Sequence, residues 1–137
     1  MATYGKFNQT VEDWAEGVYT SSTDQFTVAL TTNANAPVAT NSVLANLTEI
    51  SYTNLSTRNI TTSSSGQTSG TFTHLFTDLV LTASGAVATF RHVVIYNNTP
   101  TTPLDPLLAR YDFGSDLTLA SGETLTIDWT TSSWTVV

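Results

Sequence analysis

Cysteine is absent from this chain of 137 residues, and Lys6 is its single lysine. A chain without cysteine has no disulfide framework and no thiolate metal ligand, so its stability must come from packing within the chain or between subunits. Charged residues make up only 11% of the chain, against about a quarter of an ordinary soluble domain. The net charge is −7 and the arginines number three. These few cations cannot build the basic patch that a phosphate backbone requires, and we therefore expect no nucleic-acid partner.

Long apolar runs are missing as well. No stretch approaches the roughly 20 residues of a membrane-spanning helix, so we expect no membrane partner. The opening segment, MATYGKFNQTVEDWAEG, has no basic region followed by an apolar run, and we expect no signal peptide. Apolar residues nonetheless reach 40% of the chain, which is enough for the core of one domain.

Threonine and serine are what the chain has in abundance, with 28 and 14 residues. Threonine is β-branched and stiff at χ1, so it fits a pleated, half-exposed surface better than a helix. Such a composition favours β-sheets whose faces are polar without being charged. It is more typical of a protein that is packed and displayed than of one that performs chemistry.

One helix is predicted, over residues 7–18, where apolar side chains recur at helical spacing. Thr10 and, three residues later, Asp13 resemble a capping box at its start. Gly17 is expected to end the helix. The pattern places one apolar stripe against the rest of the domain.

Most of the remaining chain reads as strands. Residues 24–32, DQFTVALTT, alternate between apolar and polar side chains, which predicts a strand with one buried face. The tripeptide Ala-Ser-Gly occurs at 83–85 and again at 120–122, and both copies are interpreted as hairpin turns. Residues 62–70, TSSSGQTSG, are interpreted as a flexible, uncharged loop.

About eight strands and one short N-terminal helix define the predicted fold class. The regular spacing of turns indicates an all-β protein, a two-sheet antiparallel β-sandwich of jelly-roll or immunoglobulin-like type. We expect residues 10–137 to form this single domain. Residues 1–9 are a candidate N-terminal arm that reaches a neighbouring subunit, and the alternative is a frayed terminus.

No motif carries recognisable chemistry. His74 and His92 each lie inside a predicted strand, in line with apolar residues, so we expect packed or interfacial side chains. Serine is common but occurs in no G-x-S-x-G motif, and Asp112–Gly114 matches a kinase magnesium motif by letters alone. We predict no enzyme, no catalytic residue and no cofactor.

Two kinds of binding site stay open as alternatives. Four acidic residues that are close in sequence might form a calcium site, although their spacing fits no EF-hand and turn carboxylates explain them adequately: Asp112, Asp116, Glu123 and Asp128. The three tryptophans might line a sugar site, and core packing is the alternative: Trp14, Trp129 and Trp134. We predict no metal.

Several segments together resemble a family of small virion proteins of tailed bacteriophages. They cover about four fifths of the chain: YGKFNQTVEDWAEGVY, DQFTVALTTNANAP, LANLTEISY, LTASGAVATFRHVVIYNNTP, LLARYDFGSDLTL and SGETLTIDW. The shared pattern is one of spaced strands and turns, and it contains no catalytic residues. The chain does not resemble the short, glycine-rich, lambda-type decoration protein.

The resemblance implies a capsid decoration (cement) protein that binds the outer head surface and stabilises contacts between capsomers. Its partners would be the major capsid protein and further copies of itself, as a homo-oligomer and most plausibly a trimer. It would be located on the virion, at the capsid surface, after synthesis in the bacterial host cytoplasm. The alternative is a tail-associated receptor- or glycan-binding module of the virion.

Five residues are the candidates for protein interfaces. Tyr4 and Phe7 would act as apolar anchors of the N-terminal arm, with Lys6 between them. Arg91 lies in a predicted strand beside apolar residues, and we expect it to pair with a carboxylate across a contact between subunits. His92 follows it in the same strand.

Overall fold

The computed structural model describes residues 2–129 and 134–136. The described chain forms ten strands, one α-helix and two 3₁₀ turns: β1 (Thr3–Lys6), α1 (Gln9–Ala15), β2 (Phe26–Thr31), η1 (Asn33–Asn35), η2 (Leu44–Asn46), β3 (Asn59–Ile60), β4 (Thr62–Thr68), β5 (Thr71–Phe76), β6 (Leu79–Thr82), β7 (Phe90–Asn97), β8 (Leu107–Leu117), β9 (Thr124–Ile127) and β10 (Trp134–Val136). Every strand pairing is antiparallel. The predicted all-β class is confirmed, with a sandwich-like arrangement of ten strands.

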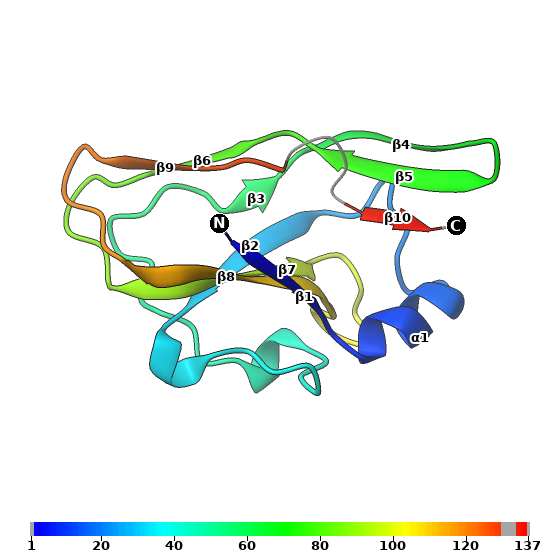
Figure 1. Ribbon diagram of the computed structural model, residues 1–137, viewed down its shortest axis with the longest axis horizontal. Helices are drawn as coiled ribbons and strands as arrows, with labels where there is room; N and C mark the ends of the chain where they lie inside the picture. Colours follow the sequence, from blue (N-terminus) through cyan, green and yellow to red (C-terminus); the bar gives the residue numbers. More distant parts are fainter. Residues whose placement is uncertain (1, 130–133, 137) are drawn as a thin grey trace.

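Two layers make up the sandwich (Figure 1). The first layer is a five-stranded sheet in the order β1-β8-β7-β2-β3. The second layer consists of two smaller sheets that lie side by side, β10-β5-β4 and β6-β9. The main core fills the space between the layers, with buried side chains from β2, β7 and the second layer, such as Val28, Phe90 and Leu81.

The first layer is covered on both of its faces. Its other face holds a smaller core that includes Phe7, Val94 and Leu107, against which Leu44 and Leu47 of the loop around η2 pack. All six residues of β2 are therefore buried. The expectation of one buried face for this strand is wrong, because a long loop covers the face that alternation assigned to solvent.

The helix is shorter than predicted and faces differently. It spans Gln9–Ala15, and Gly17, with φ of +76°, ends it as expected. Asp13 is buried, whereas Val11 is 56% exposed. The Thr10 hydroxyl donates to the carbonyls of Leu107 and Leu108. The capping box is absent here because this hydroxyl fixes α1 to β8 instead.

Residues 62–70 are a strand and a turn. Thr62–Thr68 form β4, which pairs with β5 through a two-residue connection. Ser69 and Gly70 have φ of +52° and +83°, and a tight I′ hairpin turn requires positive φ at both positions. The predicted flexible loop is wrong, since the turn at Ser69–Gly70 lets the hydroxyl-rich stretch pair with β5.

The two Ala-Ser-Gly turns do not form hairpins. β6 pairs with β9, whereas β7 and β8 belong to the other layer, so each turn carries the chain between layers. The turns instead lie against each other: the Gly122 amide donates to the Ala83 carbonyl at 2.8 Å, and the Ser121 hydroxyl donates to the Ser84 carbonyl at 3.2 Å. The repeated Ala-Ser-Gly tripeptide therefore marks two neighbouring crossings between the layers.

Candidate functional site

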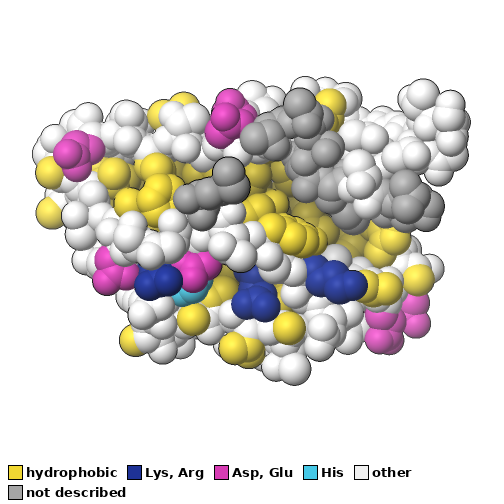
Figure 2. Space-filling view, viewed as in Figure 1, with side chains coloured by type: hydrophobic (Ala, Val, Ile, Leu, Met, Phe, Trp, Pro, Cys, Tyr) yellow, Lys and Arg dark blue, Asp and Glu magenta, His cyan; other side chains and the backbone are white. Residues whose placement is uncertain are grey.

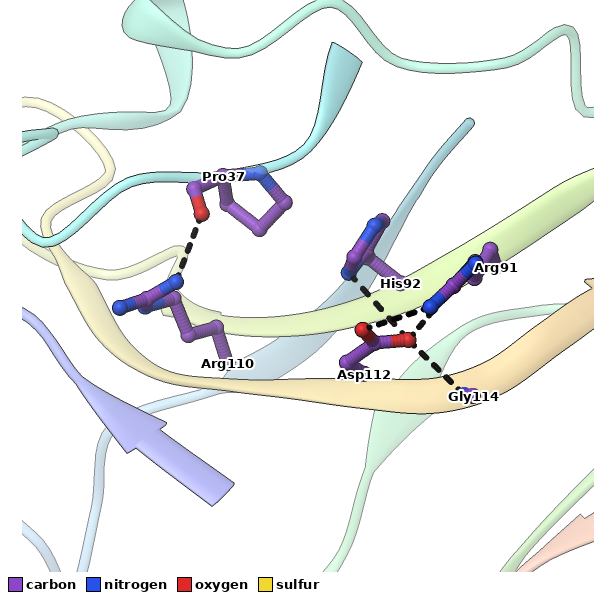
Figure 3. A network of polar contacts seen from close by, with 6 residues as sticks. All are labelled: Pro37, Arg91, His92, Arg110, Asp112 and Gly114. Atoms are coloured by element: carbon purple, nitrogen blue, oxygen red, sulfur yellow. Dashed lines mark hydrogen bonds and ion pairs between the residues drawn. The ribbon is translucent and has the colours of Figure 1, made fainter. Parts of the chain in front are cut away.

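A charged network joins β7 to β8 on the first layer (Figure 3). Arg91 donates to Asp112 through Nε, at 2.8 Å from Oδ1, and through Nη2, at 3.1 Å from Oδ2. The Gly114 amide also donates to Oδ1, at 2.8 Å. The chain of β8 bulges after Asp112, and φ of +92° at Gly114 turns its amide back toward this carboxylate. The two bonds from Arg91, followed by the one from Gly114, lower the pKa of Asp112 to about 2.

His92 lies beside this pair. Its Nδ1 is 4.0 Å from Asp112 Oδ1, and the side chain is only 6% exposed. Burial lowers the pKa of His92, so the ring is neutral at neutral pH. Both oxygens of Asp112 already accept bonds, which leaves this carboxylate poorly suited to act as a base. The network is therefore a link between strands rather than an acid–base centre.

Arg110 holds the loop after β2 against the same sheet (Figure 3). Its Nη1 donates to the Pro37 carbonyl at 2.7 Å. The guanidinium carbon lies 5.9 Å from the centre of the Phe7 ring. Gly5 faces the arginine so closely that an added Cβ would be 2.9 Å from Nε. The segment before α1 and the loop after β2 thus meet on one arginine.

The five predicted interface residues lie on or beside neighbouring strands of the first layer. Arg91 and His92 come together at Asp112, so the carboxylate that pairs with Arg91 belongs to the same chain. Tyr4 packs on Tyr111, with ring centroids 5.6 Å apart. The structure does not bring Tyr4 to the Asp112 network, since Tyr111 and Asp112 are consecutive residues of β8 and point to opposite faces.

The predicted arm lies within the fold of its own chain. β1 pairs with β8, and Phe7 is completely buried in the smaller core. Tyr4, in contrast, is 58% exposed, and Lys6 is also exposed at this end of the sheet. A contact of Tyr4 and Lys6 with a neighbouring subunit stays a prediction. Phe7 is engaged inside the domain.

A second cluster had no signal in the sequence. Arg58 donates to the Val28 carbonyl and lies over the Tyr52 ring, with the guanidinium carbon 3.5 Å from its centre. The Tyr52 hydroxyl donates to Glu49 and accepts from the Leu30 amide at 2.9 Å. These contacts fix the long loop onto β2, and they give the cluster a structural role.

The outer face of the second layer was predicted only in part from the sequence. Alternation along the strands turns ten side chains away from the core, and we call these the neutral face: Ser64, Thr68, Thr71, Thr73, Leu75, Val80, Thr82, Thr124, Thr126 and Thr135. The described residues of the five strands in this layer include no Asp, Glu, Lys or Arg. The high threonine count was the available signal, but the gathering of hydroxyls on one layer depends on the pairing.

The cationic residues that lie in described strands all belong to the first layer, whereas three exposed carboxylates, Asp78, Glu123 and Asp128, adjoin the ends of β6 and β9 in the second layer. In Figure 2 the Lys and Arg side chains of this view lie over the five-stranded sheet, while the region of the β4–β5 hairpin is without charge. Lys6, Arg91, Arg110 and Asp112 all belong to β1, β7 or β8. The neutral face offers hydroxyl groups and two apolar side chains, Leu75 and Val80.

A hollow of about 560 Å³ lies beside α1. Gln9, Asp13 and Glu16 line one side of it, and residues of two loops line the other. Gln9 donates to Asp13 Oδ1 at 3.2 Å. Burial raises the pKa of Asp13. The hollow combines two carboxylates, those of Asp13 and Glu16, with otherwise neutral side chains, and its described lining contains no histidine or cation.

The tryptophan and histidine side chains that are described pack inside the molecule. Trp129 is 5% exposed, and Trp14 stacks against Phe72 with ring centroids 5.5 Å apart. Burial lowers the pKa of the fully buried His74 to about 4. Trp129 follows β9 and Trp134 begins β10, and these two strands belong to different sheets. The Trp134 side chain lies outside the described residues.

Neither a metal cluster nor a membrane span emerges from the described residues. Their His, Asp and Glu side chains form no group of three that could hold a metal ion. Asp112, a member of the calcium alternative, instead accepts bonds from Arg91. Throughout the described part of the chain, no helix has both the length and the apolar character needed to span a bilayer.

No protein-family model matches this chain, and no curated protein or solved structure matches it with significance. What the fold and the candidate site define is a class: an antiparallel β-sandwich-like protein in which one layer carries the cationic strand residues and the described strands of the other layer are uncharged.

Proposed function

We propose that this protein is a capsid decoration protein of a tailed bacteriophage, and that it binds the outer head surface and stabilises contacts between capsomers. The observation that carries the proposal is the neutral face, an outer sheet surface made almost wholly of threonine and serine. The resemblance of the sequence to small phage virion proteins supports the same function.

Neutral hydroxyl groups suit binding to a repeated protein surface. They supply hydrogen bonds without the large desolvation cost of burying an ion. A flat sheet face also offers the β-branched side chains in fixed rotamers, so little side-chain entropy is lost on contact. Leu75 and Val80 add apolar area, and Val80 is 50% exposed.

A lattice strengthens modest contacts. A copy that touches two capsomers makes its second contact at a high effective concentration, so each contact needs only modest affinity. The net charge of −7 would oppose crowding of copies on a capsid. The described strands of the second layer contain no Asp, Glu, Lys or Arg, so the neutral face can approach the capsid while the carboxylates that adjoin the ends of β6 and β9 stay in solvent.

The glycan-binding alternative has less support. A sugar site needs accessible aromatic faces, and Trp129 is 5% exposed while Trp14 is packed against Phe72. The tail location has no supporting observation among the described residues, and we keep the decoration function as the single proposal.

The test is the position and copy number of the protein in the phage that encodes it. Cryo-electron microscopy and quantitative mass spectrometry of the virion should place hundreds of copies on the head. In addition, Thr126→Lys on the neutral face should lower head occupancy several-fold. Val11→Lys, an exposed position on α1, is the matched control and should leave occupancy unchanged.

A few copies per particle, all on the tail, would refute the proposal. Point variants are preferable to deletion of residues 1–9, because Phe7 is part of the core and β1 covers one side of β8. The trimeric state that the resemblance implies stays a prediction, which the mass of the purified protein tests.

A further inference from the structure

The edge of the second layer at β4 is open. β4 ends the sheet β10-β5-β4, and among the described residues it pairs with β5 alone. With seven residues it is the longest of the described strands that end a sheet, since β1, β3, β6, β9 and β10 have two to four. The amide and carbonyl groups that point away from β5 form a row able to pair with another strand.

From Ser64 to Thr68 this edge lacks the features that discourage pairing. Proteins usually protect open edges with lysine, proline, inward-pointing charges or bulges. Residues 59–77 contain no charged residue and no proline. The single register shift lies between Thr62 and Ser64, and the stretch from Ser64 to Thr68 keeps a regular register with β5. By contrast, β1, at one end of the other layer, carries Lys6.

The edge is also held in its extended conformation before any partner arrives. The tight turn at Ser69–Gly70 fixes the register of β4 against β5. Phe72 of β5 packs on Trp14 of α1, which anchors the hairpin to the domain. In Figure 1 the hairpin extends to one end of the molecule, and most residues of β4 are exposed. A preorganised strand loses little conformational entropy on pairing.

We propose that β4 pairs with β4 of a second copy of this chain, antiparallel about a two-fold axis. The two copies would then share one continuous sheet with the strand order β10-β5-β4-β4-β5-β10. With Ser65 opposite its own symmetry mate, all seven residues, TSSSGQT, lie opposite a residue of the other strand.

The charges favour the β4 edge as the place where a second copy can pair. Two molecules of net charge −7 repel each other, and association is least opposed where neither surface carries a charge. The β4 edge meets this condition on both sides, because identical uncharged strands face each other. Serine and threonine side chains also form favourable hydrogen bonds across neighbouring strands. The inference does not depend on capsid attachment, and it gives a dimer instead of the trimer that the resemblance implies.

Charge reversal at Ser64 tests the pairing. Ser64 is exposed, and in this register the side chains at position 64 of the two copies lie diagonally across the axis, within reach of each other. Light scattering should give the wild type twice the chain mass of 14.7 kDa. Ser64→Lys and Ser64→Asp should each halve this mass, because like charges meet. An equal mixture of the two variants should restore the dimer.

Thr82→Lys is the matched control, since Thr82 is an exposed threonine of the neutral face on β6, away from this edge. It should leave the mass at the dimer value. Far-UV circular dichroism checks that each variant is folded. Hydrogen exchange of the wild type adds a second measurement, in which β4 amides become slower to exchange as protein concentration rises.

A wild type that stays monomeric over the concentration series overturns the inference. So does a trimer, or a dimer that persists in Ser64→Lys. Head occupancy is measured separately with Thr126→Lys, so the pairing of β4 and the proposed capsid attachment can fail independently.

Discussion

Single residues in this protein act mainly by joining segments that are far apart in sequence. Thr10 ties α1 to β8, Arg110 ties β8 to the loop at Pro37, and Arg58 ties β2 to the loop that covers it. Each arginine that the structure describes donates a hydrogen bond to a backbone carbonyl or a carboxylate. These side chains stabilise the fold, and they leave the neutral face free for contacts.

The Arg91–Asp112 pair predicts a defined pH dependence. The pKa of Asp112 is about 2 in the fold, against an ordinary value of 3.8. A carboxyl whose pKa is lowered on folding stabilises the fold above its unfolded pKa, and this contribution is lost as the pH falls through the folded pKa. Between about pH 4 and pH 2 the wild type should lose the stability that this pair provides.

Arg91→Ala should raise the pKa of Asp112 toward 3.8, as followed by carbon NMR of the carboxyl group during a pH titration. Its stability deficit against the wild type should be present at pH 7 and shrink at pH 2. Arg58→Ala, which removes an arginine from a different cluster, should leave the Asp112 titration unchanged. An Asp112 midpoint that does not move in Arg91→Ala would show that the pair is not the cause.

At the scale of elements, the helix illustrates how tertiary contacts decide which face is buried. Alternation at helical spacing groups Val11 with Phe7, yet the fold buries Phe7 completely and exposes Val11. The reason is that Phe7 precedes the helix and enters the smaller core, while Thr10 and Asp13 face the rest of the domain. The long-range bonds of Thr10 to the Leu107 and Leu108 carbonyls hold this face of the helix against β8, and buried Asp13 accepts a bond from Gln9 within the helix.

Phe7 and Val11 give a paired test of this arrangement. Phe7→Ala removes a fully buried ring and should lower the free energy of unfolding by about 3–5 kcal/mol. Val11→Ala removes an exposed side chain at a helical position and should change it by less than about 0.5 kcal/mol. Urea denaturation measures both. Equal losses in the two variants would mean that the helix packs through the stripe predicted from the sequence.

At the scale of the whole molecule, the absence of charged residues from the described strands of the second layer is the property from which the proposed function follows. The crossings at the two Ala-Ser-Gly turns send β6 and β9 to one layer and β7 and β8 to the other. Uncharged strands thus gather in the second layer. One molecule then offers two surfaces of different chemistry, and the open β4 edge lies at the border of the neutral one.

The neutral face predicts how capsid attachment depends on salt. Contacts between charged groups weaken as ionic strength rises, whereas neutral hydrogen-bonding and apolar contacts do not depend on screening. Head occupancy should therefore change by less than about two-fold between roughly 50 and 500 mM salt. Sedimentation of heads with bound protein measures it. A steep loss of bound protein with salt would assign the attachment to charged residues instead.

Much of the fold and of the site could be predicted from local patterns. The β class follows from threonine content and turn spacing, and the end of the helix follows from Gly17. Burial of both histidines follows from their apolar neighbours within strands. Arg91 was expected to pair with a carboxylate across a contact between subunits, but its partner is Asp112 of the same chain, 21 residues away, and no local pattern selects one acidic residue among several.

The sequence by itself determined that this protein is built of strands, that it has few charges and that hydroxyl groups dominate its surface, because composition and side-chain period are local properties. Only the tertiary structure decided where these features lie. Strand pairing turned a predicted loop into the β4 edge, a covering loop buried the second face of β2, and two similar turns became neighbouring crossings instead of hairpins. Each of these outcomes depends on contacts between residues far apart in the chain. Such contacts produce no local periodicity in the sequence from which they could be predicted.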